Sequence, residues 1–392
     1  MNQTSNISFW EKEHFTNYDF IVIGSGIVGL STAITALEFN PDLNVLILER
    51  GLFPSGASTK NAGFACFGSV SELLEDLDKM EEQAVVELVK QRWEGLSLLR
   101  RRLGDDSIDF QQYGGYELLF DDAPVEIDAL DKLNKLLFPL FGENVYHLAD
   151  DKIEALGFNP DKVKHLIFNK IEGQIDTGKM MKALLKKAQL MGATLLTGAT
   201  VTKYQEKNEG VELSVESLSQ NINIKGQKLA ICTNAFIHDW FPKLDLNPGR
   251  GQVLVTNPIA NLKIKGTFHY DAGYYYFRNI GNRIIFGGAR NVDFDTETTT
   301  DIALNDKIQQ KLEEDLKAFI IPNQHFTIDH KWAGIMGFGL VKKPIIKQLG
   351  ERIVIGVRLG GMGVAIGSSV GQEVAHLIVN DAMKTKFAIG KK

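Results

Sequence analysis

The chain has 392 residues, of which 43 are lysine or arginine and 49 are aspartate or glutamate, so its formal net charge is −6. A chain of this length can bury a large core and form two domains. Its mild acidity, with no basic patch, argues against nucleic acid or an anionic membrane as its main partner. Cys66 and Cys232 are the only two cysteines, which excludes a disulfide framework and predicts two buried thiols.

The first 17 residues mix polar and charged side chains, without a basic start or an apolar run. They therefore do not predict a signal peptide. We find no stretch long and apolar enough to span a bilayer, and we expect a soluble cytoplasmic protein.

An apolar strand that begins at Asp19 runs directly into a glycine turn and a helix. Gly24 makes the tight turn, Gly26 lets the backbone approach a pyrophosphate, and Gly29 lets the helix, residues 27–39, pack against the strand. The start of that helix offers free N–H groups and a partial positive charge to phosphates. A second strand, residues 44–48, ends at Glu49, an acidic residue placed to bind ribose hydroxyls. Together these features predict a dinucleotide site.

The segment 54–64 follows this second strand and is rich in glycine, serine and other small residues. Because it leaves directly from the ribose-binding strand, we expect it to fold its backbone amides around the rest of the dinucleotide.

Further elements follow from hydrophobic spacing and turn residues. Apolar residues at helical spacing predict helices within 72–103, and Asp176 or Thr177 is placed to cap a helix over 179–191. The other elements expected in the first part of the chain are a strand near 116–120, short helices at 128–140 and 151–156, and strands at 192–196, 199–204, 211–215, 222–224 and 228–232.

The second part of the chain is rich in aromatic strands. A helix start is expected at 235–240, strands between 249 and 288, an amphipathic helix at 305–319, and a strand at 353–356 that leads to a second glycine turn, 359–364, and a helix, 365–379. In the strand around residue 276, alternation places Tyr274, Tyr276 and Arg278 on one face and Tyr275 and Phe277 on the other.

In this order, the motifs resemble the FAD-dependent amine and amino-acid oxidoreductases of the D-amino-acid oxidase, glycine oxidase and sarcosine oxidase superfamily. The segments that carry the resemblance are the first turn with Glu49, 58–63, 232–235, 250–252, 332–334 and 360–363. The resemblance implies an α/β fold with a discontinuous Rossmann-type FAD-binding domain, residues 1–85, 150–245 and 325–392. An α+β substrate domain on a mostly antiparallel sheet would comprise residues 86–149 and 246–324.

The resemblance also implies which residues bind FAD, and it implies no metal. Glu49 would bind the adenosine ribose, Arg50 the adenine edge, and Val201 the adenine through its backbone. The remaining implied cofactor-binding residues are Gly24, Ser25, Gly26, Ile27 and Gly29 in the first turn, Ser58, Lys60, Asn61, Ala62 and Gly63 in the loop, Thr233, and Gly360, Gly361, Met362, Gly363 and Val364 in the second turn. A helix N-terminus aimed at N1 and O2 of the flavin stabilises the negative charge of the reduced ring.

Two positions depart from the pattern of these relatives. In amino-acid-oxidising relatives an arginine that binds the substrate carboxylate stands where this chain has Met336, and Leu359 replaces a histidine. Methionine cannot form a bidentate ion pair with a carboxylate. We therefore favour an amine without an α-carboxylate as the substrate, while the alternative is that Arg278 or Arg290 takes the place of the missing cation.

We hypothesise that a small amine or amino acid gives a hydride from its α-carbon to flavin N5, and that the resulting imine is hydrolysed to a carbonyl. A dry aromatic pocket would keep the amine neutral. The residues expected to act on the substrate are Tyr274, Tyr276, Arg278, Trp332 and Met336. Lys60 is expected near the flavin, oxygen or another compound would accept the electrons, and His238 and His269 are expected to be structural.

Two other functions remain open from the sequence alone. The first turn and Glu49 are compatible with an NAD-dependent dehydrogenase, although the second glycine turn argues against it. The loss of an arginine at Met336 is compatible with a non-catalytic or electron-passing flavoprotein subunit.

Overall fold

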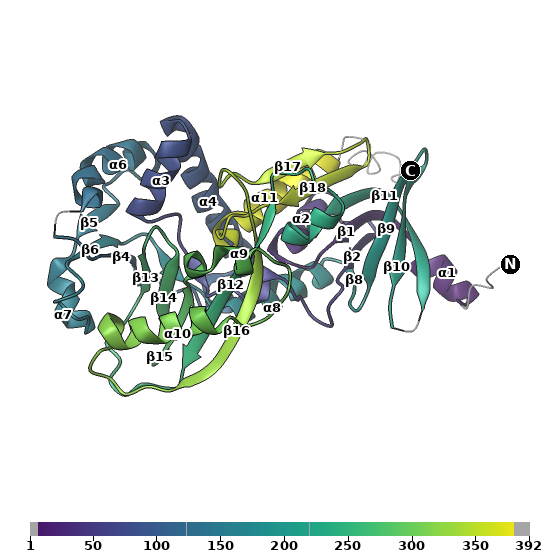
Figure 1. Cartoon of the computed structure of the whole chain (residues 1–392). Helices are drawn as coiled ribbons and strands as arrows, with labels where there is room; N and C mark the ends of the chain where they lie inside the picture. Colours follow the sequence, from purple (N-terminus) through teal and green to yellow (C-terminus); the bar gives the residue numbers. More distant parts are fainter. Residues whose placement is uncertain (1–6, 123, 219, 380–392) are drawn as a thin grey trace.

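The computed structural model describes residues 7–122, 124–218 and 220–379. Two eight-stranded sheets occupy the two ends of an elongated molecule (Figure 1). Among the described residues, no helix is long and apolar enough to cross a membrane.

The first sheet holds the N-terminal strand at its centre, in the order β17-β18-β11-β1-β2-β8, with β10 and β9 added to β11. The pairs from β18 to β8 are parallel. Phe20, Ile21 and Val22 of β1 are fully buried, because helices and loops cover both faces of a parallel sheet. The strands are β1 Asn17–Ile23, β2 Val45–Leu48, β8 Thr194–Leu196, β9 Thr200–Lys207, β10 Gly210–Glu216, β11 Asn221–Ile231, β17 Ile345–Gln348 and β18 Ile353–Val357.

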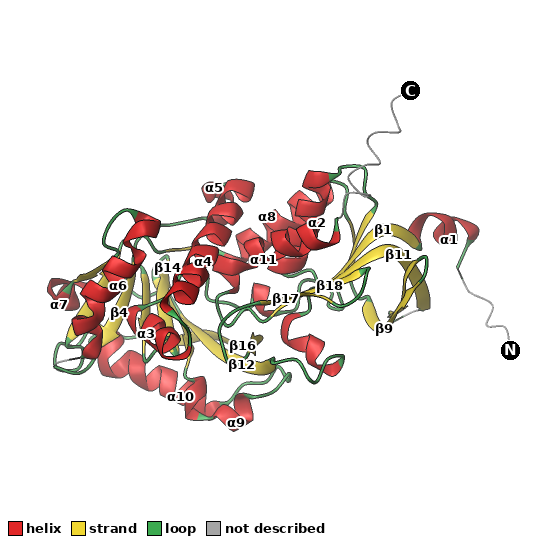
Figure 2. Ribbon diagram, turned by 90° about the horizontal axis from the view of Figure 1, so that it is seen from above, coloured by secondary structure: helices red, strands yellow, loops and turns green. Residues whose placement is uncertain are grey.

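Helices α2, Ile27–Phe39, and α11, Gly363–Ile378, pack side by side against this sheet (Figure 2). Glycines allow the close approach, since a Cβ on Gly371 would lie 2.6 Å from the carbonyl oxygen of Val28. Helices α4, Glu82–Leu103, and α8, Thr177–Leu190, join the same apolar core. Asp176 caps α8, as predicted, by accepting from the Lys179 N–H at 2.8 Å. Shorter helices are α1 Phe9–Phe15, α5 Asp105–Ile108, η1 Ala57–Thr59 and η3 Asn234–Asp239.

The second sheet has the order β16-β12-β15-β14-β13-β4-β6-β5 and is antiparallel except between β13 and β4. One face packs on α10, Asp306–Asp315, through a core that includes Tyr275 and Phe277. The opposite face carries Tyr276 and Arg278 and packs on the segment 62–64. The strands are β4 Gly115–Leu119, β5 Tyr146–Leu148, β6 His165–Asn169, β12 Asn247–Thr256, β13 Thr267–Tyr270, β14 Tyr275–Ile280, β15 Arg283–Gly288 and β16 Ile328–Phe338.

The remaining elements connect or cover these two sheets. A two-stranded sheet pairs β3, Phe64–Ala65, with β7, Gly173–Gln174. The helices are α3 Val70–Lys79, α6 Val125–Phe141, α7 Ile153–Leu156 and α9 Phe294–Glu297, with short 3₁₀ or π turns η2 Asp150–Lys152, η4 Arg290–Val292 and η5 Leu316–Ile320.

Strand pairing divides the chain differently from the predicted domain ranges. Strands β6 and β16 fall in segments predicted for the FAD-binding domain but pair within the second sheet. Helix α4 falls in a segment predicted for the substrate domain but packs on α11. The predicted strands 222–224 and 228–232 form one strand, β11, and the helix start at 235–240 is the short η3. These differences arise because long-range pairing, not local periodicity, assigns an element to a sheet.

Buried carboxyl groups lie where β4 meets the segment before β7. Glu172 accepts from the Phe67 N–H at 3.1 Å, and Glu117 accepts from the Val70 N–H at 2.8 Å. Burial raises the pKa of Glu172 from 4.5 to about 8 and that of Glu117 from 4.5 to about 7. The folded protein therefore holds protons on these groups at pH values where the unfolded chain releases them.

We expect Glu172→Gln to flatten the pH dependence of stability. While folded Glu172 is protonated and unfolded Glu172 is ionised, the free energy of unfolding falls by about 1.4 kcal/mol per pH unit. Glutamine keeps an acceptor for the Phe67 N–H but does not titrate, so the variant should exceed the wild type in stability at pH 8.5. Urea unfolding at pH 5.5, 7 and 8.5 measures this slope, and the exposed Glu154→Gln is the control. Equal slopes in wild type and Glu172→Gln would contradict the assignment.

Candidate active site

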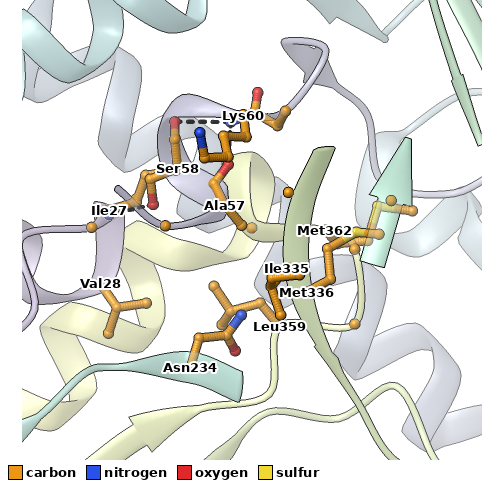
Figure 3. Close-up of a pocket in the computed structure, with 18 of the residues that line it drawn as sticks. Ile27, Val28, Ala57, Ser58, Lys60, Asn234, Ile335, Met336, Leu359 and Met362 are labelled. Atoms are coloured by element: carbon orange, nitrogen blue, oxygen red, sulfur yellow. Dashed lines mark hydrogen bonds between the residues drawn. The ribbon is translucent and has the colours of Figure 1, made fainter. Parts of the chain in front are cut away.

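A cavity of about 570 Å³ extends from the first glycine turn to the aromatic face of the second sheet. Its volume falls in the range of about 300–1,000 Å³ typical of small-molecule sites. Figure 3 shows Ala57, Ser58 and Lys60 on one side of it, and Met336 of β16 with Met362 of the second turn on the other. The predicted cofactor-binding residues that line it are Gly24, Ser25, Gly26, Ile27, Glu49, Arg50, Ser58, Lys60, Asn61, Ala62, Val201, Thr233, Gly360, Gly361, Met362, Gly363 and Val364.

The first glycine turn has no room for side chains. Gly24 has a φ of +100°, and a Cβ on it would lie 2.7 Å from the carbonyl oxygen of Cys232. A Cβ on Gly29 would lie 1.9 Å from the carbonyl oxygen of Gly24, so Gly29 supports the turn from behind and does not line the cavity. At the start of α2, the Ile27 N–H donates to Ser58 Oγ at 3.0 Å (Figure 3).

The Glu49 carboxylate is held by donors from its own chain. One oxygen accepts from the N–H and hydroxyl of Ser25, at 3.3 and 2.7 Å. The other accepts from the Gly51 N–H at 2.8 Å and the Ser55 hydroxyl at 2.9 Å. These four bonds use the lone-pair directions of a carboxylate, so a ribose hydroxyl would take the place of the Ser25 or Ser55 hydroxyl.

The loop 57–63 is fixed mainly by its own polar side chains. Asn61 donates to the Ser58 carbonyl at 3.0 Å and accepts from the Gly63 N–H at 2.9 Å and the Thr177 hydroxyl at 2.8 Å. The Trp332 indole donates to the Lys60 carbonyl at 3.0 Å. Gly63, with a φ of +77°, faces Ile175 and does not line the cavity.

Two helix N-termini reach this cavity from different parts of the chain. Helix α2 begins at Ile27 and α11 begins at Gly363, directly after Gly360 and Gly361 at φ values of +56° and +84°. The Thr233 hydroxyl at the cavity wall is buried and has no hydrogen-bond partner among the described residues. Two positive helix ends and an unpartnered hydroxyl fit a bound dinucleotide.

The other end of the cavity has an aromatic wall and a floor of glycines. Gly251 and Gly334 lie opposite each other on β12 and β16, and both line the cavity together with Tyr274, Tyr276 and Met336. A Cβ on Gly251 would meet Met336 at 2.7 Å. Burial raises the pKa of Tyr276 from 10.0 to about 12, so its phenol stays protonated. The arrangement forms a flat, largely apolar chamber next to the loop 57–63.

Arg278 does not belong to this chamber, contrary to the prediction. Its side chain is 3% exposed and does not line the cavity. The guanidinium donates to the carbonyl oxygens of Ala62, Ile175 and Asn279. Tyr274 does line the cavity, as predicted, but it precedes β14 and its ring packs on Phe294. Trp332 holds the loop from behind and does not line the cavity.

The sequence interpretation missed several groups that line the cavity. His269 on β13 was expected to be structural, but its buried ring lines the cavity and its Nε2 has no partner among the described residues. Burial lowers the pKa of His269, so the ring is neutral near neutral pH. Lys342 pairs with Asp76 at 3.2 Å, and Glu72 and Glu75 of α3 also line the cavity. His269 is directly paired with Tyr276 between β13 and β14, so both side chains lie on the same face of the sheet.

A family model for FAD-dependent oxidoreductases matches residues 19–377. The chain belongs to this family. FAD is therefore the cofactor of this enzyme, and the alternative of an NAD-dependent dehydrogenase is not supported. A search of curated protein sequences finds no match.

Solved structures of similar fold cover nearly the whole chain. L-proline dehydrogenase from P. horikoshii shares 20% identity over 92% of this chain and 93% of its own, with a TM-score of 0.76. Glycine oxidase from Geobacillus kaustophilus shares 18% over 92% and 94%, with a TM-score of 0.74. L-amino acid deaminase from Proteus vulgaris, lacking its specific insertion, shares 16% over 93% and 90%, with a TM-score of 0.72. At these identities the likeness establishes the fold and confirms the predicted α/β architecture.

Proposed function

We propose that this FAD-dependent oxidoreductase oxidises the C–N bond of a small amine or amino acid to an imine, which water hydrolyses to a carbonyl compound. The observation that carries this proposal is the continuity of one cavity from the two helix N-termini to the aromatic chamber. Bound FAD supplies the two-electron acceptor for this oxidation. The names of the three similar structures, which act on proline, glycine and L-amino acids, agree with such a substrate.

The residues of the chamber act on the substrate by position and by excluding water. Tyr274, Tyr276 and Met336 surround a small substrate with largely apolar surface, which disfavours a charged ammonium. The neutral ring of His269 at the same wall can accept the ammonium proton. Oxygen or another acceptor then takes the electrons, and Lys60 lies in the loop beside the expected flavin position.

The proposal is tested with the purified protein after FAD reconstitution. Its visible spectrum should show a flavin, and anaerobic addition of a substrate should bleach it. The panel consists of D- and L-amino acids, N-methyl amino acids, and simple monoamines, diamines and polyamines. Bleaching by a member of the panel supports the proposal. A flavin that chemical reductants bleach but no panel member does would contradict it and favour an electron-passing subunit.

A further inference from the structure

Arg290 is a cation at the aromatic end of the cavity that has no acidic partner among the described residues. Its guanidinium lies 4.2 Å from the ring centre of Phe338 and 4.8 Å from that of Phe294. Two of the lysines that line the cavity, Lys79 and Lys342, are neutralised within the chain. Lys342 lies 3.3 Å from Glu75 and 3.2 Å from Asp76, and Lys79 lies 2.6 Å from Glu75.

The backbone at the end of β15 directs Arg290 to this position. Gly288 and Ala289 precede it with φ values of +117° and +59°, and the Ala289 N–H donates to the Tyr274 carbonyl at 2.8 Å. A left-handed alanine is strained and persists only where its surroundings hold it. A Cβ on Gly288 would lie 2.0 Å from the Tyr274 carbonyl oxygen, so a side chain is excluded there. The turn is thus built to present Arg290.

The guanidinium lies next to Met336. A Cβ on Gly249 would lie 3.3 Å from an Arg290 terminal nitrogen, and Gly249 is paired with Met336 between β12 and β16. Directly paired residues of an antiparallel sheet have side-chain origins about 5 Å apart. Arg290 therefore places a positive charge beside Met336, from the turn that follows β15.

The surroundings of Arg290 leave its charge available to a ligand. The charged or titratable groups that influence it are Glu297 and the hydroxyls of Tyr274 and Tyr276. Glu297 is already bound by Arg250, with contacts of 2.6 and 2.9 Å. Burial lowers the pKa of Arg290, but a guanidinium remains protonated in proteins. A partly desolvated, unpaired cation is costly, and an anion bound to it offsets that cost.

We propose that Arg290 binds the carboxylate of the substrate, so that the enzyme acts on amino acids in preference to amines that lack a carboxylate. The inference rests on the proposed oxidation of a C–N bond. It reverses the preference for carboxylate-free amines that Met336 suggested in the sequence. The guanidinium lies over two aromatic rings, and its N–H groups can bind both oxygens of a carboxylate.

Ligand binding without turnover tests the role of Arg290. The FAD-loaded wild type, Arg290→Met, Arg290→Lys and Arg283→Met are titrated with benzoate and with benzamide, and the flavin absorbance is followed. Arg283 is a matched control because it begins β15, the strand that leads to Arg290, but pairs with exposed Asp329 at 2.5 Å. We expect Arg290→Met to weaken benzoate binding about 10–100-fold, and Arg290→Lys to weaken it less. Benzamide binding should change less than about twofold, since it carries no charge.

Matched substrates provide a second measurement. Anaerobic flavin reduction is compared for L-proline with pyrrolidine, and for D- and L-alanine with ethylamine. The wild type should prefer the amino acid of a pair, and Arg290→Met should lose that preference while its FAD content stays equal to that of Arg283→Met.

Three results would overturn the role of Arg290: no benzoate binding by the wild type, equal benzoate binding by Arg290→Met, or a wild-type preference for the carboxylate-free amines. Failure of the proposed oxidation would look different. Benzoate would then bind in an Arg290-dependent manner, while no amine or amino acid reduces the flavin.

Discussion

Replacing Gly29 with alanine is expected to reduce FAD affinity at least about 100-fold. The new Cβ would lie 1.9 Å from the carbonyl oxygen of Gly24 and 3.2 Å from a methyl group of Val22. The closest atom belongs to the backbone, so no side-chain rotation can relieve the overlap, and the turn must separate from α2. A loss of about 100-fold in affinity corresponds to about 2.8 kcal/mol, which the lost contacts between the turn and the pyrophosphate would supply. Overpacking should also lower stability by about 1–3 kcal/mol.

The matched control for Gly29→Ala is Gly178→Ala in the first turn of α8. Gly178 is exposed and does not line the cavity, and its new Cβ would approach only the Asp176 side chain, at 3.3 Å. Alanine is a better helix former than glycine by about 1 kcal/mol, so this variant should keep its stability and FAD affinity. FAD affinity is measured by flavin fluorescence during titration of the apoprotein, and stability by urea unfolding. Wild-type FAD affinity in Gly29→Ala would show that the glycine is not needed for the turn.

The parts of the fold that could be predicted from the sequence are those with local causes. Helix α2 begins and ends where the glycine turn and the apolar spacing predict, at Ile27 and Phe39. The positive φ values of Gly24, Gly360 and Gly361 fit the two predicted turns. In each case residues close in sequence determine the backbone, so one segment is sufficient to predict the element.

The parts that could not be predicted depend on contacts between distant segments. Strand β6 falls in a range predicted for the FAD-binding domain, yet it pairs in the second sheet with β4, which lies about fifty residues earlier in the chain. The ion pair between Lys342 and Asp76 joins residues 266 positions apart. Nothing in either local sequence indicates that these side chains meet at one cavity.

The roles of the two candidate arginines also depend on contacts between segments that are distant in sequence. Arg278 lies within a predicted aromatic strand and Arg290 follows the next one, and the sequence left open which of them could bind a carboxylate. In the structure the two arginines have different surroundings. The Arg278 guanidinium donates to the carbonyl oxygens of Ala62 and Ile175. The Arg290 guanidinium lies over two aromatic rings. Arg278 is therefore expected to stabilise the site, and Arg290 is proposed to bind the substrate.

Arg278→Met is expected to lower the free energy of unfolding by about 3–5 kcal/mol. The substitution removes the donors to the carbonyl oxygens of Ala62, Ile175 and Asn279, in a place with almost no access to water. Hydrogen bonds from a charged donor contribute about 1.5–3 kcal/mol each, and unsatisfied buried acceptors add a penalty. Because the variant no longer buries a charge, the loss of free energy of unfolding is smaller than the three hydrogen bonds would give if added together. Because Ala62 belongs to the loop 57–63, FAD affinity should fall as well.

The two arginine substitutions should lower different properties: Arg278→Met the stability of the protein, and Arg290→Met its affinity for benzoate. Urea unfolding and benzoate titration are measured for Arg278→Met and Arg290→Met, with Arg283→Met as the control on the neighbouring strand. Arg278→Met should lose stability, yet the fraction that retains FAD should bind benzoate with nearly wild-type affinity. Arg290→Met should lose benzoate affinity with a smaller change in stability, because its guanidinium makes no hydrogen bond with the described residues. Weakened benzoate binding in FAD-loaded Arg278→Met, with stability unchanged, would indicate that Arg278 binds the substrate and would contradict its structural role.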